Sequence, residues 1–205
     1  MTEPARATRR RPRQGKMAAM GAHVDLTHHF LIAMPAMADP RFAHTLAFVC
    51  EHSPEGTIAI VVNKPTDMTV SKLLSQIDVA AGAARFDAPV LSGGPVQSNH
   101  GFVLHRPLGN WQSTLAVSDD LGLTTSKDVL EAAARGEGPH DFLVSLGYAG
   151  WGAGQLEQEL AANAWLTVAA DADVMFDLPP ERRLPAAMQL LGIDFSRLSE
   201  DVGHA

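Results

Sequence analysis

The segment from Gly147 to Gln155 contains residue types that could form a binding site. Its glycines and aromatic residues are interspersed, and the residues of interest are Gly147, Tyr148, Gly150, Trp151, Gly152, Gly154 and Gln155. Glycine lets a ligand approach the backbone closely, and free N–H groups at the start of a helix bind anions. Tyrosine and tryptophan are favoured in protein-docking surfaces. The segment contains no acid, base or metal ligand, so it indicates binding rather than a particular reaction.

Three interpretations of this segment are open from the sequence alone. The first is a cradle for a phosphate or another anion, although the glycine spacing matches neither the dinucleotide-binding fingerprint nor a P-loop. The second is a docking patch for a protein partner around Tyr148 and Trp151. The third is a tight connection from a strand to a helix that needs a positive φ, with Trp151 packed in the core.

Two further turns could converge with this segment on one anionic ligand. Asn63 and Lys64 stand at the predicted end of a strand, and Gly93 and Gly94 lie in the turn 92–95. Lys64 would supply a positive charge, and the two glycines would supply backbone donors. Ordinary turn chemistry explains the same residues, because proline ends strands and paired glycines form bends.

Cys50 is the only thiol in the chain. On a regular strand it shares a face with His52, and an imidazole beside the sulfur would lower the thiol pKa, as a reactive thiolate requires. The same alternation places Cys50 beside Phe48 and Leu46 on an apolar face, which indicates a buried and inert cysteine. Because there is no second cysteine, dithiol redox cycling within one chain is excluded.

The nine histidines do not form a metal-binding pattern. His28 and His29 are adjacent, and His100 and His105 are five apart, which places them on opposite faces of a strand. The sequence has no His-Glu-x-x-His, no Cys-x-x-Cys, no Asp-rich calcium loop and no Gly-x-Ser-x-Gly. We therefore expect no metal and no cofactor, and the residues favour a protein that is not an enzyme.

The elements that would position these residues are strands with interspersed helices. Turn residues at 53–56 join two β-favouring runs, 45–52 and 57–63, in a predicted hairpin. Further strands are predicted at 28–35, 89–91, 101–105, 113–117, 121–123, 141–146, 165–168 and 174–176, and helices at 69–77, 125–134, 155–162 and 180–191. A capping box at 125–128 would open the second helix, Glu157 and Glu159 would face solvent on the third, and Pro185 would kink or restart the last. This order predicts an α/β or α+β fold in a single compact domain.

Charge is unevenly distributed along the 205 residues. Residues 1–16 hold six of the 16 Lys and Arg and one of the 23 Asp and Glu, which leaves ten basic and 22 acidic residues in the remainder. An acidic body repels phosphate backbones, so we expect no direct binding of nucleic acid by it. We expect residues 1–22 to form a disordered basic arm before one domain at 23–205. The arm could instead be a tail for nucleic acid or an anionic surface, or precede the true start at Met17 or Met20.

The sequence also bears on location. No run of 18 apolar residues predicts a transmembrane helix, and the apolar stretch after the arginines is too short for a twin-arginine signal. A single cysteine allows no internal disulfide, which fits a reducing compartment. We therefore expect a cytoplasmic protein without membrane attachment, either a monomer or a weak homodimer, with Trp151 as one possible centre of a dimer interface.

Several strings in combination resemble one family. They are residues 26–35, 50–52 with 63–65, 92–96, 123–126 and 146–157, and together they are similar to the YqgE/AlgH family of bacterial proteins. The resemblance covers about residues 26–205, with 192–194 near its end. It implies a compact fold with mixed strands around a barrel-like core, flanked by several helices. It also implies the label of transcriptional regulator, which rests on regulatory effects, and it offers no agreed catalytic residues.

These observations predict a non-enzymatic regulatory or binding protein that affects transcription indirectly. Its working surface is expected at the glycine-rich segment with Tyr148, Trp151 and Gln155, extended by Lys64 and the 92–95 turn. Its partner would be another protein or a small anionic ligand. The alternative is a protein or enzyme that binds a small anion or nucleotide at the glycine-rich helix start, with Cys50 as a candidate nucleophile.

Overall fold

The computed structural model describes residues 24–80 and 86–192. The predicted basic arm, residues 1–22, lies outside these ranges, as do residues 193–205 at the end of the family resemblance. The boundary between arm and domain therefore stays a prediction.

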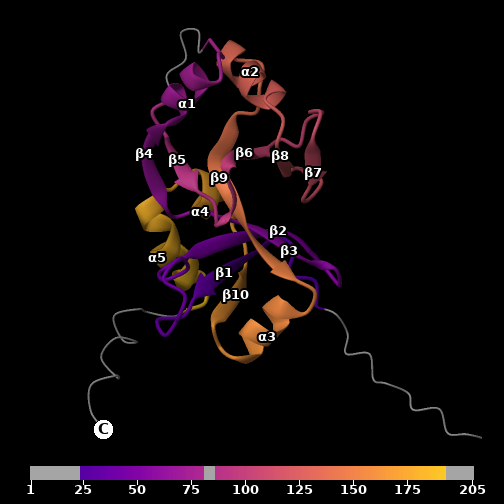
Figure 1. Cartoon of the computed structure of the whole chain (residues 1–205), viewed down its shortest axis with the longest axis vertical. Coiled ribbons are helices and arrows are strands. Elements are labelled where there is room, and N and C mark those ends of the chain that lie inside the picture. The colour runs from indigo at the N-terminus through magenta and orange to yellow at the C-terminus, as the bar shows by residue number, and fades with distance from the viewer. Residues whose placement is uncertain (1–23, 81–85, 193–205) are drawn as a thin grey trace, which may run out of the picture.

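One long strand, β9 (Asp141–Gly152), organises the sheet. The first two thirds of β9 pair antiparallel with β6 (Val96–Arg106), and the last third of β9 pairs antiparallel with β3 (Gly56–Val61). β5 (Pro89–Ser92) pairs with β9 in parallel. β9 thereby connects two groups of strands that lie one above the other in Figure 1. The prediction of a strand that ends before the glycines is wrong, because strand pairing continues to Gly152.

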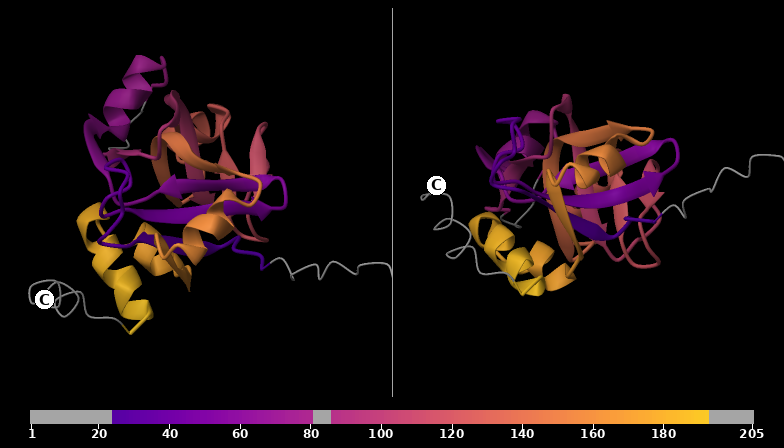
Figure 2. Two further views of the ribbon diagram at one scale, coloured as in Figure 1. Left: turned by 60° about the horizontal axis from the view of Figure 1, so that its bottom comes forward. Right: turned by 90° about the horizontal axis from the view of Figure 1, so that it is seen from below.

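The strands form one curled sheet. Its order is β10-β1-β2-β3-β9-β6-β8-β7, and β4 is attached through β5. The remaining bounds are β1 His29–Ala33, β2 Leu46–Ser53, β4 Pro65–Thr69, β7 Thr114–Ala116, β8 Gly122–Thr124 and β10 Trp165–Ala169. Every pair except β5 with β9 is antiparallel, and the curl makes a half-barrel (Figure 2). The predicted single domain with a mixed, barrel-like sheet is confirmed, and β2 and β3 are the predicted hairpin.

Five short helices flank the sheet in the described part of the chain. They are α1 Val70–Gln76, α2 Asp128–Arg135, α3 Gln155–Ala161, α4 Ala172–Phe176 and α5 Pro180–Leu190. α1 and α2 lie at one end of the molecule and α3 at the other, while α4 and α5 lie beside the sheet (Figure 1). α1 begins as the sequence predicts, because the Thr69 hydroxyl accepts the N–H of Lys72. α5 continues through Pro185 without a restart.

Two local predictions, a strand at 174–176 and a capping box at 125–128, are wrong. Residues 174–176 belong to α4 rather than to a strand, because the Asp171 carboxylate accepts the N–H of Asp173 and caps a helix there. The capping box at 125–128 is not formed, since the N-cap of α2 is Lys127, whose side chain makes no cap bond. Asp128 instead accepts the Ser126 hydroxyl at 2.6 Å.

The interior is divided into three buried clusters. The first joins β1, β2, β3 and β6 to α4 and α5. The second lies between α3 and the strands β1, β2, β3, β9 and β10, and the third lies under α1 and α2. β9 contributes side chains to all three clusters. This strand therefore links the three parts of the core.

Candidate functional site

Gly147 and Gly94 let two backbone segments pass at very short range. Gly147 has a φ of 73°, and a Cβ atom there would collide with the carbonyl oxygen of Gly94. A Cβ atom at Gly94 would collide with the backbone of Tyr148. Gly93 continues the contact, because its N–H donates to Leu146 at 2.8 Å and its carbonyl accepts the N–H of Val61 at 2.9 Å. The backbone groups of Gly93 thus hold β3, the 92–95 turn and β9 together, which agrees with the structural interpretation of the glycines.

One backbone donor at the end of β9 is used within the fold. The Gly152 N–H donates to the Gln155 side-chain oxygen at 3.1 Å. Gly154 is the N-cap of α3 with a φ of 71°, the left-handed conformation that glycine adopts easily. α3 is only seven residues long, so its dipole is small. These contacts do not support an anion cradle at this helix start.

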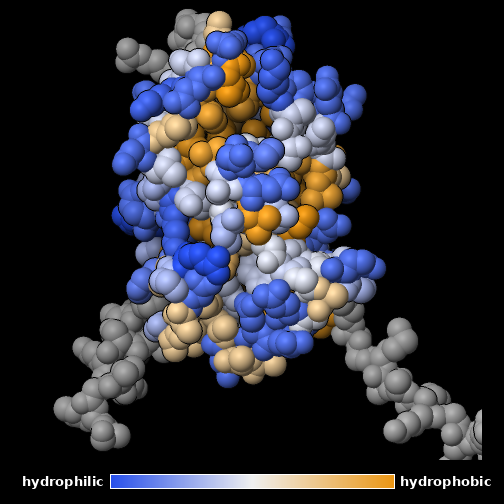
Figure 3. Space-filling model, in the orientation of Figure 1, coloured by the Kyte–Doolittle hydropathy of each residue, from blue (hydrophilic) through white to orange (hydrophobic). Residues whose placement is uncertain are grey.

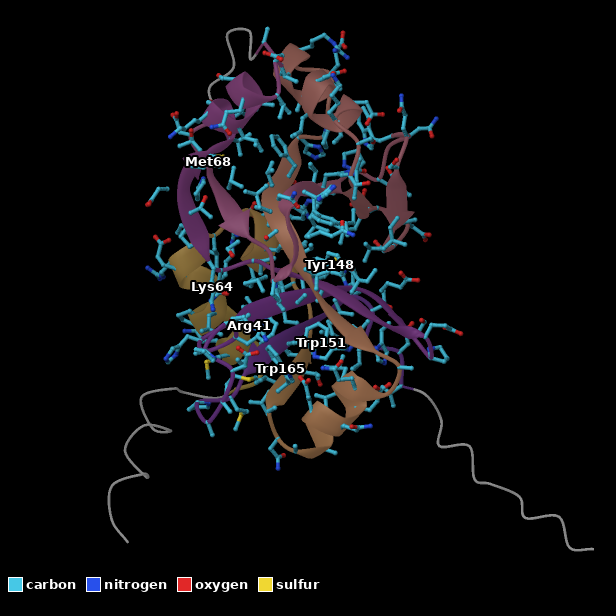
Figure 4. All side chains as sticks on the ribbon, viewed as in Figure 1. Arg41, Lys64, Met68, Tyr148, Trp151 and Trp165 are labelled. Atoms are coloured by element: carbon cyan, nitrogen blue, oxygen red, sulfur yellow. The ribbon has the colours of Figure 1, made fainter. Side chains whose placement is uncertain are left out.

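Trp151 is anchored in the second cluster by a shared carboxylate. One oxygen of Glu159 accepts the indole N–H of Trp151 at 2.9 Å and that of Trp165 at 2.8 Å, while the other accepts the Gln155 amide at 3.0 Å. Phe42 stacks on Trp151 with ring centroids 6.1 Å apart. Figure 4 shows the two tryptophans close together near α3. The prediction that Glu159 faces solvent is wrong, and Trp151, 6% exposed, has little surface to offer a partner.

Tyr148, in contrast, stands at the junction of two surface pockets. A pocket of about 430 Å³ and one of about 550 Å³ share Tyr148 and Ile58 as lining residues. The Tyr148 ring packs edge-on against Phe102 at 5.4 Å. The first pocket is also lined by Glu51 and Glu55, both exposed. These two adjoining pockets are named the Tyr148 groove. Figure 4 places Tyr148 near the middle of the face, and Figure 3, in the same orientation, shows hydrophobic surface between hydrophilic residues in that part of the molecule.

Lys64 lines a different pocket. This hollow of about 330 Å³, named the Arg41–Lys64 pocket, is lined by Arg41, Phe42, Val61, Lys64, Ser92, Gly94, Pro95 and Ser98. The Lys64 ammonium donates to the Arg41 carbonyl at 2.6 Å, and Figure 4 shows the two residues as neighbours. Lys64 and Gly94 therefore meet in one pocket, whereas Gly93 is buried behind it and Gly152 lies beside α3.

Asn63 is committed to holding strands. Its side-chain oxygen accepts the N–H of Leu46 at 2.8 Å, and its amide donates to the carbonyl of His44 at 2.9 Å. Both ends of the side chain therefore bind the chain itself, and Asn63 supports Lys64 by position rather than by contact with a ligand.

Cys50 and His52 do not form a reactive pair. Cys50 is 1% exposed, and burial raises the pKa of its thiol. A bulge in β2 at Cys50 shifts the register with β3 and breaks the alternation that predicted a shared face. Cys50 joins the first cluster, whereas the His52 ring accepts or donates a hydrogen bond at Thr57 and reaches toward Glu157 of α3 at 3.5 Å.

The described residues contain no group of three or more His, Cys, Asp or Glu side chains placed to hold a metal ion. Within residues 24–80 and 86–192, no helix combines the length and the apolarity needed to cross a membrane.

Sequence reasoning missed several residues of these sites. Arg41 and Phe42 carry no motif, and they reach Lys64 and Trp151 only through the fold. Glu159 could have been found from its two flanking tryptophans, since buried indole N–H groups need an acceptor. Glu51 and Glu55 were not singled out, because the sequence around them indicated only the turn at 53–56.

The comparisons with known proteins agree with the fold. The family model described as AlgH-like matches residues 30–196. A UPF0301 protein from Nitrosospira multiformis is 59% identical over 185 residues, which cover 89% of this chain and 98% of the relative. A UPF0301 protein from Azoarcus sp. is 57% identical over 182 residues, covering 88% of this chain and 97% of the relative.

Two solved structures are similar. The solution structure of the AlgH protein from Pseudomonas aeruginosa has a TM-score of 0.72 and 47% identity, and the match covers 90% of this chain and 98% of that one. The crystal structure of protein DIP2367 from Corynebacterium diphtheriae, at 18% identity, shares the fold with a TM-score of 0.61, over 82% of this chain and 94% of that one. On its family match, its close relatives and its fold, the chain belongs to the AlgH-like family, which its motifs resemble.

Proposed function

We propose that this protein is a non-enzymatic, cytoplasmic binding protein whose Tyr148 groove takes a basic, partly apolar segment of a partner protein. The observation that carries the proposal is the junction of two pockets at Tyr148 and Ile58. Their volumes of about 430 and 550 Å³ lie within the usual range for ligand pockets.

The floor of the groove supports apolar contact. Ile58 and Leu115 are partly buried and pack against the first cluster, and Tyr148 and Phe102 add aromatic surface. Gln112 on the same lining offers a side-chain amide for hydrogen bonding. Apolar surface with a few polar groups is the usual composition of binding pockets.

The charge of the groove supports a cationic partner. Glu51 and Glu55 are both exposed on the lining, and the chain after residue 16 has 22 acidic against ten basic residues. The local carboxylates and the overall negative field both attract a basic segment and speed its association.

The state of the only thiol supports binding rather than covalent catalysis. A nucleophilic cysteine needs access and a lowered pKa, whereas Cys50 is buried and burial raises its pKa. Its thiol donates to the Phe48 carbonyl, 3.7 Å from the sulfur, whereas the His52 ring is hydrogen-bonded to Thr57.

The groove is tested by selection of peptides from a random library on the full chain, followed by anisotropy titration of the enriched peptides. We expect peptides rich in Lys and Arg with one or two apolar residues. Tyr148→Ala and the charge reversal Glu51→Lys with Glu55→Lys should each weaken binding about tenfold. Lys72→Met on exposed α1 is the matched control and should bind as the wild type does. Absence of enrichment, or equal binding to all variants, contradicts the proposal.

Any effect on transcription is proposed to be indirect, through such a partner. A gel-shift experiment at physiological salt, comparing the full chain with one that starts at Met20, tests this. Neither form should bind DNA with sequence specificity, because the acidic body repels phosphates. Tight, sequence-specific binding by the shorter form would show that the effect is direct.

A further inference from the structure

The positive charges of this acidic protein are arranged unequally. Among the described residues, four surface cations each contact a carboxylate: Arg41 with Asp39, Arg106 with Asp141, Lys127 with Glu131, and Arg135 with Glu137. Lys64 makes no ion pair within 4.0 Å in the same part of the chain, and its ammonium donates a hydrogen bond to a backbone carbonyl, that of Arg41. An ammonium group carries three donors, so two of the Lys64 donors are left for another acceptor.

A second cation lies at the same pocket. Arg41 also lines it, and its guanidinium binds the Asp39 carboxylate through Nε at 3.0 Å and Nη2 at 2.6 Å. That hydrogen bond lowers the pKa of Asp39, so the pair is charged at neutral pH. The Nη1 group of Arg41 donates to neither Asp39 oxygen. The pocket therefore has two cations, Arg41 and Lys64, near a single carboxylate, that of Asp39, whose charge acts on both.

The remaining lining has the composition of a small binding site. Ser92 and Ser98 are exposed, and their hydroxyls make no hydrogen bond to another of the described residues. Phe42 and Pro95 provide apolar surface on the same lining. Lys64 is partly buried, and burial lowers its pKa while Asp39 opposes this, so the ammonium is partly desolvated and its attraction for an anion is less screened by water.

From this arrangement we infer that the Arg41–Lys64 pocket binds a small organic anion, one carboxylate or phosphate group on a short apolar or ring-shaped body. The oxyanion accepts hydrogen bonds from Lys64 and a serine hydroxyl, with Arg41 beside it, and the apolar body lies against Phe42. A volume of about 330 Å³ is at the lower end of the range for ligand pockets, which excludes a dinucleotide. The site is separate from the Tyr148 groove and does not depend on it.

Binding is measured with benzoate, phenyl phosphate and inorganic phosphate, with neutral benzamide as the ring-only control, at constant ionic strength on the full chain. Amide chemical shifts of Gly94 and Ser98 report the pocket. Tryptophan fluorescence is a second readout, because Phe42 stacks on Trp151. We expect saturable shifts for at least one anion at about millimolar concentration and none for benzamide. The preference between benzoate and phenyl phosphate separates a carboxylate site from a phosphate site.

Three variants make the inference falsifiable. Lys64→Met should weaken anion binding about tenfold, because it removes the charged donor. Asp39→Asn should strengthen it about threefold, because it frees the Arg41 guanidinium from a competing carboxylate. Lys72→Met, which removes an exposed lysine from α1 outside the lining, should change binding less than about twofold. Shifts that do not saturate, or that respond equally to Lys64→Met and Lys72→Met, overturn the inference.

Discussion

The glycine and aromatic end of β9 and the Arg41–Lys64 pocket differ in how their polar groups are used. At the end of β9 the Gly152 N–H binds Gln155, and both indole N–H groups bind Glu159. In the pocket, the Lys64 ammonium donates a hydrogen bond to the Arg41 carbonyl and makes no ion pair within 4.0 Å among the described residues. The first region has the residue types of a binding site, but its two indole donors and the Gly152 N–H are satisfied within the fold. The second has few recognisable residue types but retains donors that a ligand can use.

This difference shows that residue types can identify a candidate binding site. Whether the site can bind a ligand then depends on whether its hydrogen-bond donors are already used within the fold. Buried polar groups must find partners within the fold, and those that do contribute to stability rather than to binding. Substitutions at the end of β9 should therefore destabilise the protein, and substitutions in the pocket should leave its stability nearly unchanged.

The largest effect is expected for Gly147→Ala. The new Cβ meets the backbone of the 92–95 turn, and the residue must keep a φ of 73°, so unfolding free energy should fall by about 4 kcal/mol or more. Gly101→Ala is the control, because nothing lies within 4 Å of a Cβ there, and it should change stability by less than about 0.5 kcal/mol. Urea denaturation measures both. If Gly147→Ala does not fold, its yield as soluble protein beside that of Gly101→Ala gives the same ranking, and equal stability would refute the structural role.

Glu159→Ala should have the next largest effect. It leaves the indole N–H groups of Trp151 and Trp165, 6% and 2% exposed, without their acceptor, at a cost of about 2 kcal/mol in unfolding free energy. Glu159→Gln keeps one acceptor oxygen and should cost less. Gln158→Ala, on the exposed side of the same helix, controls for helix propensity. Tryptophan fluorescence during urea unfolding measures all three, and a Glu159→Ala midpoint equal to that of Gln158→Ala would show that the carboxylate does not anchor α3.

The sequence predicts well where the information is local. The 53–56 turn signals the β2–β3 hairpin, and Thr69 signals the start of α1, because each depends on residues a few positions apart. The path of β9 through its glycines could not be predicted, since its partners β3 and β6 lie about 40 to 90 residues earlier in the chain. α4 was missed because Val174 and Phe176 favour a strand, and the cap at Asp171 decided otherwise.

The candidate sites divide in the same way. Lys64 and Gly94 could be named from their turns, but Arg41 lies 23 residues before Lys64, and the bond from the Lys64 ammonium to its carbonyl is a product of the fold. The supposed pair of Cys50 and His52 failed because a bulge, which leaves no mark in the sequence pattern, turns neighbouring side chains to different faces.

The smallest effect is expected for Lys64→Met, and it sharpens the contrast most. The substitution keeps an unbranched apolar side chain of similar length and removes one hydrogen bond at the surface. The unfolding free energy should therefore change by less than about 0.5 kcal/mol. The same variant should lose most of its affinity for a small anion. Urea midpoints of Lys64→Met and Lys72→Met, measured beside the wild type, should therefore agree within error. A loss as large as that of Glu159→Ala would mean that Lys64 holds the loop of Arg41 in place, and that the pocket, like the end of β9, serves the fold.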